Sequence, residues 1–94
     1  PDGEIENIYT LKIVNQQNEP RTFRLAVDGV AGIKLDGVAG TVLVGGGEVL
    51  SLPVRARAPA DSAYGIMEIS FNVTDVDDPS VTMTEDSRFL GPTP

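Results

Sequence analysis

Apolar and polar residues alternate along several short stretches of this chain. The clearest stretch covers residues 67–74, where every second side chain is apolar: Met67, Ile69, Phe71 and Val73. On a helix these side chains would spread around much of the circumference, whereas on a strand they share one face. The stretch therefore predicts an antiparallel strand with one buried face.

Similar patterns predict six further strands. They are Ile5 to Val14, Phe23 to Val27, Ile33 to Leu35, Thr41 to Val44, Glu48 to Arg57 and Val81 to Phe89. Turn signals separate them about every 8–12 residues, and no segment shows convincing helical spacing. The chain thus predicts an all-β fold, a seven-stranded antiparallel β-sandwich of immunoglobulin or fibronectin type III-like topology. A small barrel is the alternative.

Glycine, proline and polar residues mark the predicted connections. Asn15 to Pro20 predicts a hairpin loop, and Ala58 to Tyr64 predicts a second loop. Gly45 to Gly47 predicts a hairpin turn rather than a phosphate-binding loop, because no helix and no Lys–Ser/Thr pair follow. Pro53 lacks an amide donor, so its strand is predicted to form a sheet edge or a bulge there.

The length of 94 residues predicts a single domain over residues 1–94, with a core from about residue 4 to about residue 90. No run of about 18 apolar residues is present, so the chain itself is not predicted to cross a bilayer. The first residue is Pro1, and the last four are Gly-Pro-Thr-Pro. Both ends resemble linkers, and we expect the chain to be a fragment of a larger protein.

Charge and residue types limit the chemistry of the domain. Fourteen acidic and seven basic side chains give a net charge of −7, which argues against binding to nucleic acid. The chain has no cysteine and no histidine, which excludes thiol and imidazole nucleophiles, iron–sulfur ligation, zinc fingers and disulfides. We therefore predict no catalytic residue and no cofactor site, and no enzymatic activity of the domain alone.

Two groups of charged side chains have a functional alternative. Asp75, Asp77 and Asp78 gather in a predicted acidic turn, and such oxygen-rich loops bind Ca²⁺. The spacing lacks the glycine and the distal glutamate of an EF-hand loop, so a solvated turn is the favoured interpretation. Arg55 and Arg57 face outward on one strand and are predicted to pair with acidic neighbours, or alternatively to bind an anionic partner.

Five stretches stand in a characteristic order along nearly the whole chain. They are Ile8 to Asn15, Phe23 to Val27, Leu52 to Arg55, Val76 to Ser80 and Ser87 to Pro92. Together, closing on an Asp-Asp-Pro-Ser turn and Ser-Arg-Phe-Leu-Gly-Pro, they resemble the C-terminal immunoglobulin-like domain of the FixG/CcoG cytochrome c oxidase accessory proteins.

The resemblance implies a setting for the domain. Full-length members are bacterial inner-membrane proteins whose ferredoxin-like domain holds two 4Fe–4S clusters, and the immunoglobulin-like domain comes last, expected on the periplasmic side. The family is tied to assembly of the cbb3-type cytochrome oxidase through reduction of copper for delivery. The chain would then be a non-catalytic interaction or accessory domain of an iron–sulfur oxidoreductase, with protein partners of oxidase assembly.

Other functions remain open beside this one. Met67 and Met83 are predicted to face the core, which makes a poor copper site although soft sulfur ligands suit Cu(I). A bacterial surface or secreted adhesion module, calcium-stabilised through the acidic turn, is the alternative function. A third is the addition of a partner strand at an open edge, near Pro53 or along the first strand.

Overall fold

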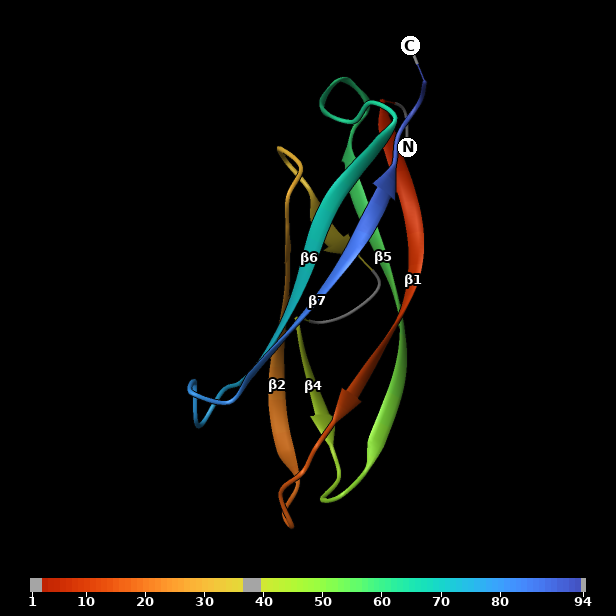
Figure 1. Ribbon diagram of the computed structural model, residues 1–94. Coiled ribbons are helices and arrows are strands. Elements are labelled where there is room, and N and C mark those ends of the chain that lie inside the picture. The colour runs from red at the N-terminus through yellow and green to blue at the C-terminus, as the bar shows by residue number, and fades with distance from the viewer. Residues whose placement is uncertain (1–2, 37–39, 94) are drawn as a thin grey trace.

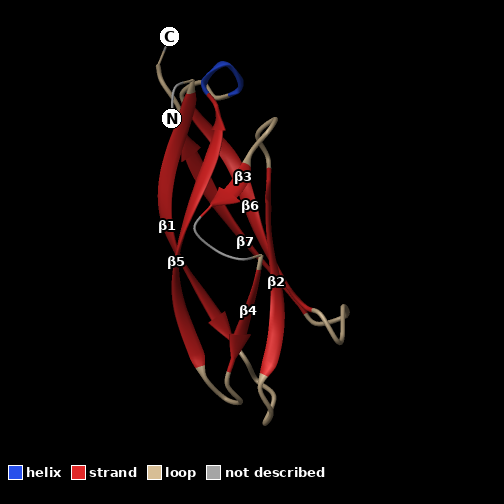
Figure 2. Cartoon of the chain, turned by 180° about the vertical axis from the view of Figure 1, so that it is seen from behind, coloured by secondary structure: helices blue, strands red, loops and turns tan. Residues whose placement is uncertain are grey.

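Seven β-strands form two antiparallel sheets that pack face to face (Figures 1 and 2). This computed structural model describes residues 3–36 and 40–93, so the outermost residues of the predicted domain, 1–2 and 94, lie outside the described part. The strands are β1 (Glu4–Val14), β2 (Arg21–Asp28), β3 (Lys34–Asp36), β4 (Thr41–Val44), β5 (Val49–Pro59), β6 (Ile66–Asp75) and β7 (Thr82–Leu90). The predicted seven-stranded β-sandwich is confirmed.

One sheet has the strand order β1-β5-β3 and the other has the order β4-β2-β6-β7. β1 pairs with β5 along its whole length, and β6 pairs with β7 from Ile66 opposite Leu90 to Thr74 opposite Thr82. β1 and β7 belong to different sheets but lie on the same side of the sandwich (Figure 1). We call the end where β1 begins and β7 ends the upper end, as it is oriented in Figure 1.

The alternating apolar residues meet between the sheets in two core clusters. The upper cluster contains Leu11, Val30, Val54, Ala56, Ala58, Ala63, Ile69, Phe71 and Phe89. The lower cluster contains Ile13, Phe23, Leu25, Val44 and Val73. The ring of Tyr9 meets that of Phe71 edge to face, with centroids 4.9 Å apart, an arrangement that adds about 0.5–1.5 kcal/mol beyond burial.

Both predicted hairpin connections are wrong, because each crosses from one sheet to the other. β1 pairs with β5, whereas β2 pairs with β4 and β6, so residues 15–20 form an arch between the sheets. Residues 45–48 form a second arch, from β4 to β5. A hairpin and an arch need the same polar and glycine residues to leave a strand, so the local sequence does not distinguish them.

The glycine run lets the two arches touch. Among its three glycines only Gly47 has a positive φ, +70°. A Cβ on Gly46 would collide with the backbone carbonyl of Asn18 in the other arch. The amide of Gly47 also donates a hydrogen bond to the carbonyl of Gln17 at 2.9 Å. Close backbone packing, more than turn geometry, therefore requires glycine here.

β5 extends further than predicted. It continues to Pro59 and is followed by a single 3-10 turn, Ala60–Ser62, so the loop predicted from Ala58 begins later. β3 pairs with β5 only from Arg55 to Arg57. Within the described residues, Pro53 therefore has β1 as its one neighbouring strand, and the predicted sheet edge is confirmed at this point.

Candidate functional site

Asp75 is fully buried, which corrects the expectation that the whole acidic turn is solvated. It takes the next inward position of β6 after Val73, and its Oδ2 accepts a hydrogen bond from Arg21 Nε at 2.7 Å. Its Oδ1 accepts the amide of Asp77 at 2.9 Å. Burial by itself raises the pKa of Asp75, but these hydrogen bonds and the Arg21 charge together lower it below its ordinary value.

The other two residues of the candidate calcium site face solvent. Asp77 and Asp78 are exposed, and Asp78 Oδ1 accepts the Ser80 hydroxyl at 2.6 Å. The three aspartates are thus close in sequence, but Asp75 is buried against the Arg21 guanidinium, whereas Asp77 and Asp78 are exposed. In the part of the chain that the structure describes, no three acidic, histidine or cysteine side chains are placed to hold a metal ion together.

Asn15 is the second buried polar side chain, and it holds the arches at the lower end. Its Nδ2 lies within hydrogen-bonding distance of the carbonyls of Glu19 (2.8 Å), Val44 (3.0 Å) and Gly45 (3.1 Å). Its Oδ1 accepts the amide of Gln17 at 2.9 Å. A buried amide with such partners fixes the surrounding backbone, so its role is structural.

Asn7 and Tyr9 of β1 reach the edge of β7 at the upper end. Asn7 Nδ2 donates to the carbonyl of Leu90 at 3.1 Å, and the amide of Leu90 donates to Asn7 Oδ1 at 3.0 Å. The Tyr9 hydroxyl donates to the carbonyl of Arg88 at 2.7 Å, and burial raises the pKa of this hydroxyl. These side chains satisfy a strand edge as a neighbouring strand would. We call residues 88–90 the clamped half of β7.

Arg57 lies in an ion-pair network on the outer face of the three-stranded sheet. Its guanidinium lies 2.6 Å from Asp36, 3.1 Å from Glu6 and 3.8 Å from Glu4. The hydrogen bond with Glu6 and these charges raise the pKa of Arg57. The predicted pairing is confirmed for this residue. For Arg55, which is exposed, it stays a prediction.

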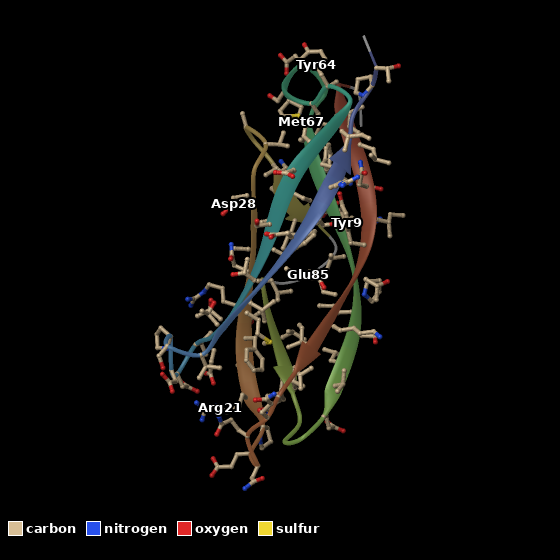
Figure 3. The ribbon with its side chains drawn as sticks, in the orientation of Figure 1. Tyr9, Arg21, Asp28, Tyr64, Met67 and Glu85 are labelled. Atoms are coloured by element: carbon tan, nitrogen blue, oxygen red, sulfur yellow. The ribbon has the colours of Figure 1, made fainter. Side chains whose placement is uncertain are left out.

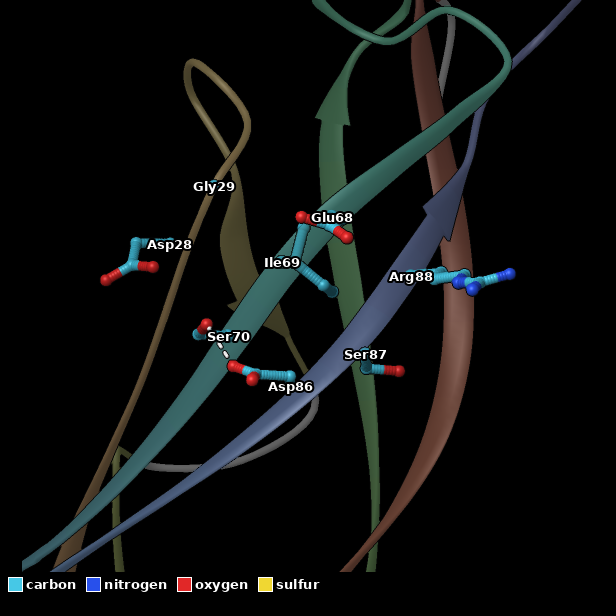
Figure 4. Close-up of a pocket in the computed structure, with 8 residues that line it drawn as sticks. All are labelled: Asp28, Gly29, Glu68, Ile69, Ser70, Asp86, Ser87 and Arg88. Atoms are coloured by element: carbon cyan, nitrogen blue, oxygen red, sulfur yellow. Dashed lines mark hydrogen bonds between the residues drawn. The ribbon is translucent and has the colours of Figure 1, made fainter.

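A shallow groove of about 350 Å³ lies on the outer face of the four-stranded sheet (Figure 4). Its lining includes three carboxylates, two serines and a guanidinium, from Asp28, Glu68, Asp86, Ser70, Ser87 and Arg88. Ser70 Oγ donates to Asp86 Oδ1 at 2.8 Å, so this serine is engaged with a carboxylate on the neighbouring strand. The groove offers hydrogen bonds and charge, but no histidine or cysteine to activate a nucleophile.

Comparison with known proteins shows where such a domain occurs. A family model described as "IG-like fold at C-terminal of FixG, putative oxidoreductase" matches residues 1–92. The chain belongs to this FixG C-terminal family. Protein RdxA of Cereibacter sphaeroides is 35% identical over 89 residues, which make up 93% of this chain and 16% of RdxA. The crystal structure of a FixG-related protein from Vibrio parahaemolyticus has 36% identity and a TM-score of 0.84, covering 95% of this chain and 81% of that chain.

The resemblance inferred from the sequence and the immunoglobulin-like fold are therefore confirmed. The FixG domain described here spans 16% of the length of RdxA, so most of that relative has no counterpart in this chain. An iron–sulfur cluster does not fit this domain, because the chain has no cysteine to ligate it. Among residues 3–36 and 40–93, no helix has the length and hydropathy needed to span a membrane.

The two methionines of the FixG domain pack against the core, as predicted, and the structure places them in different parts of it. Met67 lies opposite Phe89 and packs against the upper cluster, whereas Met83 lies opposite Val73 and packs against the lower cluster. Six positions along β6 separate these two points, which corresponds to about 20 Å. The methionines therefore do not form a joint sulfur site for copper.

The sequence did not reveal the structural roles of three polar residues that organise the FixG domain. Asn7 occupies an inward position of β1, and Asn15 continues the same alternation directly after β1 ends. Asp75 occupies an inward position of β6. A polar residue on an apolar face was the available signal, because burial without a partner is costly. In the structure, the hydrogen bonds described above satisfy the polar atoms of all three side chains.

Proposed function

We propose that this chain is the non-catalytic accessory domain of a longer, membrane-bound iron–sulfur protein. The longer protein would carry two 4Fe–4S clusters and support assembly of a cbb3-type cytochrome oxidase by reducing copper for delivery. The domain would lie on the periplasmic side of the bacterial inner membrane and would contact protein partners of oxidase assembly.

The observation that carries this proposal is the match of residues 1–92 to a family defined by its position at the C-terminus of FixG. The residues of the chain support a binding role over a catalytic one. Cysteine and histidine are absent. Among the residues that the structure describes, the buried polar side chains are Asn15, which binds the backbone, and Asp75, which binds Arg21. The chemistry left to the domain is recognition through its surface.

The test is to remove the domain from the full-length protein in a bacterium that depends on it. We expect the truncated protein to keep the optical and electron paramagnetic resonance spectra of its clusters. Activity of the cbb3-type oxidase should fall nearly as far as in a strain that lacks the whole gene. Oxidase activity that stays unchanged after removal would contradict the proposal.

A replacement control separates contact from spacing. The domain is exchanged for an unrelated β-sandwich of similar length, which preserves spacing but not the surface. We expect the exchange to be as damaging as the deletion. If the replacement restores the oxidase, the domain serves as a spacer, and the interaction role is wrong.

A further inference from the structure

The lower part of β7 is an open strand edge. Along an edge strand, every second residue directs its backbone amide and carbonyl away from the neighbouring strand. In β7 these residues include Arg88 and Leu90, because their backbone groups bind Tyr9 and Asn7 rather than β6. Following the same alternation, the backbone groups of Asp86, Thr84 and Thr82 also point away from β6. Within the described chain, no hydrogen bond reaches their backbone from outside the β6–β7 pair. We call residues 82–86 the open half of β7.

A groove of about 410 Å³, lined by both apolar and polar residues, begins beside this open half. Its lining residues come from the end of β1, the first arch, β2, the end of β6 and the beginning of β7. The strands β1 and β7 diverge toward this end of the sandwich (Figure 1). Phe23, Val81 and Met83 contribute the apolar lining of the groove, together with Val14 at the end of β1. Of these, Val14 is 39% exposed. An added strand would cover both the groove and the free backbone groups.

Glu85 favours a partner strand that carries a positive charge at the facing position. It has the same inward register as Met83 and Phe89, yet it is exposed, because β1 has left this side of β7 (Figure 3). A strand that paired with the open half would place a side chain directly opposite Glu85. An inward charge of this kind disfavours pairing with most strands, and a basic residue in the facing position removes that penalty.

The surrounding charges point to the same occupant. Asp86 is exposed on the open half itself, and Asp77 and Asp78 are exposed in the preceding turn. The chain carries a net charge of −7. A second copy pairing through the same edge would bring two acidic edges together and would place no basic side chain opposite Glu85, which disfavours a dimer formed here. A basic extended segment is the complementary partner.

We propose that the open half of β7 takes up an extended protein segment as an additional strand of the four-stranded sheet. The segment has a lysine or arginine opposite Glu85 and an apolar residue two positions away, where it covers Met83. Main-chain hydrogen bonds to Thr82, Thr84 and Asp86 provide the pairing, and the two inward side chains provide the selectivity.

The proposal deepens the interaction role suggested above and rests on it for its biological setting. Its physical test does not depend on that setting, because it uses only the chain itself. The isolated domain is suitable for this test, because the crystallised chain of the FixG-related protein is of similar extent: this chain covers 81% of it.

The probe is a capped peptide, Thr-Val-Thr-Lys-Thr-Val-Thr, titrated into the isotopically labelled domain and followed by amide chemical shifts. The matched control replaces its lysine by glutamate. We expect the lysine peptide to shift the amides of Thr82, Thr84 and Asp86 and to bind about tenfold more tightly than the control. Absence of binding at millimolar peptide, or shifts confined to other edges, would overturn the proposal.

Two variants test its two components. Thr84→Pro removes one outward amide on an edge strand, where proline is tolerated, and should abolish binding, whereas Thr84→Ala should retain it. Glu85→Lys should reverse the preference, so that the glutamate peptide binds more tightly. A circular dichroism spectrum verifies the fold of each variant. If Thr84→Pro does not fold, the result with Glu85→Lys tests the proposal instead. An unreversed preference in Glu85→Lys contradicts the role of Glu85.

The outcomes separate this proposal from the function proposed above. If neither peptide binds but exchange of the whole domain still impairs the oxidase, the interaction role stands and the surface lies elsewhere. If the lysine peptide binds as described but domain exchange has no effect, the edge is a binding site without the proposed setting.

Discussion

The two halves of β7 belong to one strand with one partner, β6, yet their outer edges differ. In the clamped half, side chains from β1 bind the carbonyl of Arg88 and both the carbonyl and the amide of Leu90. In the open half, no such contact is present within the described residues, and an acidic side chain stands at an inward position. The difference shows that side chains can cover the backbone groups of an edge strand at one end of a sandwich and leave them available for pairing at the other.

The packing beneath the two halves differs in the same way. Phe89 is completely buried in the upper cluster, whereas Met83 is only partly buried against the lower one. Divergence of β1 from β7 explains both the lower burial and the exposed edge. The predictions below test this contrast, from the largest effect to the smallest.

The largest effect should come from truncating the inward side chains of β7. Phe89→Ala should lower the free energy of unfolding by about 3–5 kcal/mol, because it leaves a cavity in the upper cluster. Met83→Ala should lower it by about 1–2 kcal/mol, because its side chain is already partly in contact with water. Urea denaturation of both variants measures the difference. Equal losses would show that the two halves are packed alike.

Acidification should weaken the turn that leads into the open half. Because the folded protein lowers the pKa of Asp75, this carboxylate stabilises the fold fully above its unfolded pKa of about 3.9. The contribution disappears as the pH falls below that value and through the lower pKa of the folded state. We expect Asp75→Asn to be less stable than the parent at neutral pH and to lose less stability between pH 5 and pH 2.

Urea denaturation of the parent and of Asp75→Asn at several pH values gives the two slopes. Asp78→Asn is the matched control, since Asp78 is exposed in the same turn and lacks a basic partner among the described ion pairs. If Asp75→Asn and the parent lose stability in parallel, the Arg21 pair does not shift the titration of Asp75.

A smaller effect is expected from removing the hydrogen bonds between β1 and the clamped half of β7. Asn7→Ala removes both hydrogen bonds to Leu90 and should cost about 1 kcal/mol, because these bonds are exposed to solvent. Tyr9→Phe removes only the bond to Arg88 and keeps the ring contact with Phe71, so it should cost about 0.5 kcal/mol. Thermal and urea unfolding measure both, and Asn7→Ala as stable as the parent would argue against the clamp.

Calcium should have the smallest effect. Asp75 is buried and engaged with Arg21, whereas Asp77 and Asp78 are exposed. We therefore expect millimolar Ca²⁺ to leave the melting temperature unchanged, because a ligand raises it only by binding the native state. A rise that a chelator reverses would restore the calcium-stabilised adhesion module as a function for this domain.

Much of the fold was predictable from local alternation. The inward positions Ile69, Phe71 and Val73 of β6 are buried as predicted, because a period of two fixes which residues share a face. The partners of β1 and β2 were not predictable in this way. Pairing across the sandwich depends on contacts between residues far apart in the sequence, which turn residues do not encode.

The candidate sites show the same division. The pairing of Arg57 followed from its outward position beside acidic residues on neighbouring strands. The burial of Asp75 did not, because the acidic turn obscured its place in the inward register of β6. Asn7 likewise interrupts an apolar face, and its partner Leu90 lies 83 positions away, where only the folded structure brings it.

Residue-resolved hydrogen exchange along β7 tests the central contrast most directly. Our account predicts a slowly exchanging amide at Leu90, which donates to Asn7, and fast exchange at Thr82, Thr84 and Asp86, with the intervening amides protected by β6. Asn7→Ala should bring Leu90 to the rate of the open half. Uniform protection of all outward amides of β7 would contradict the account.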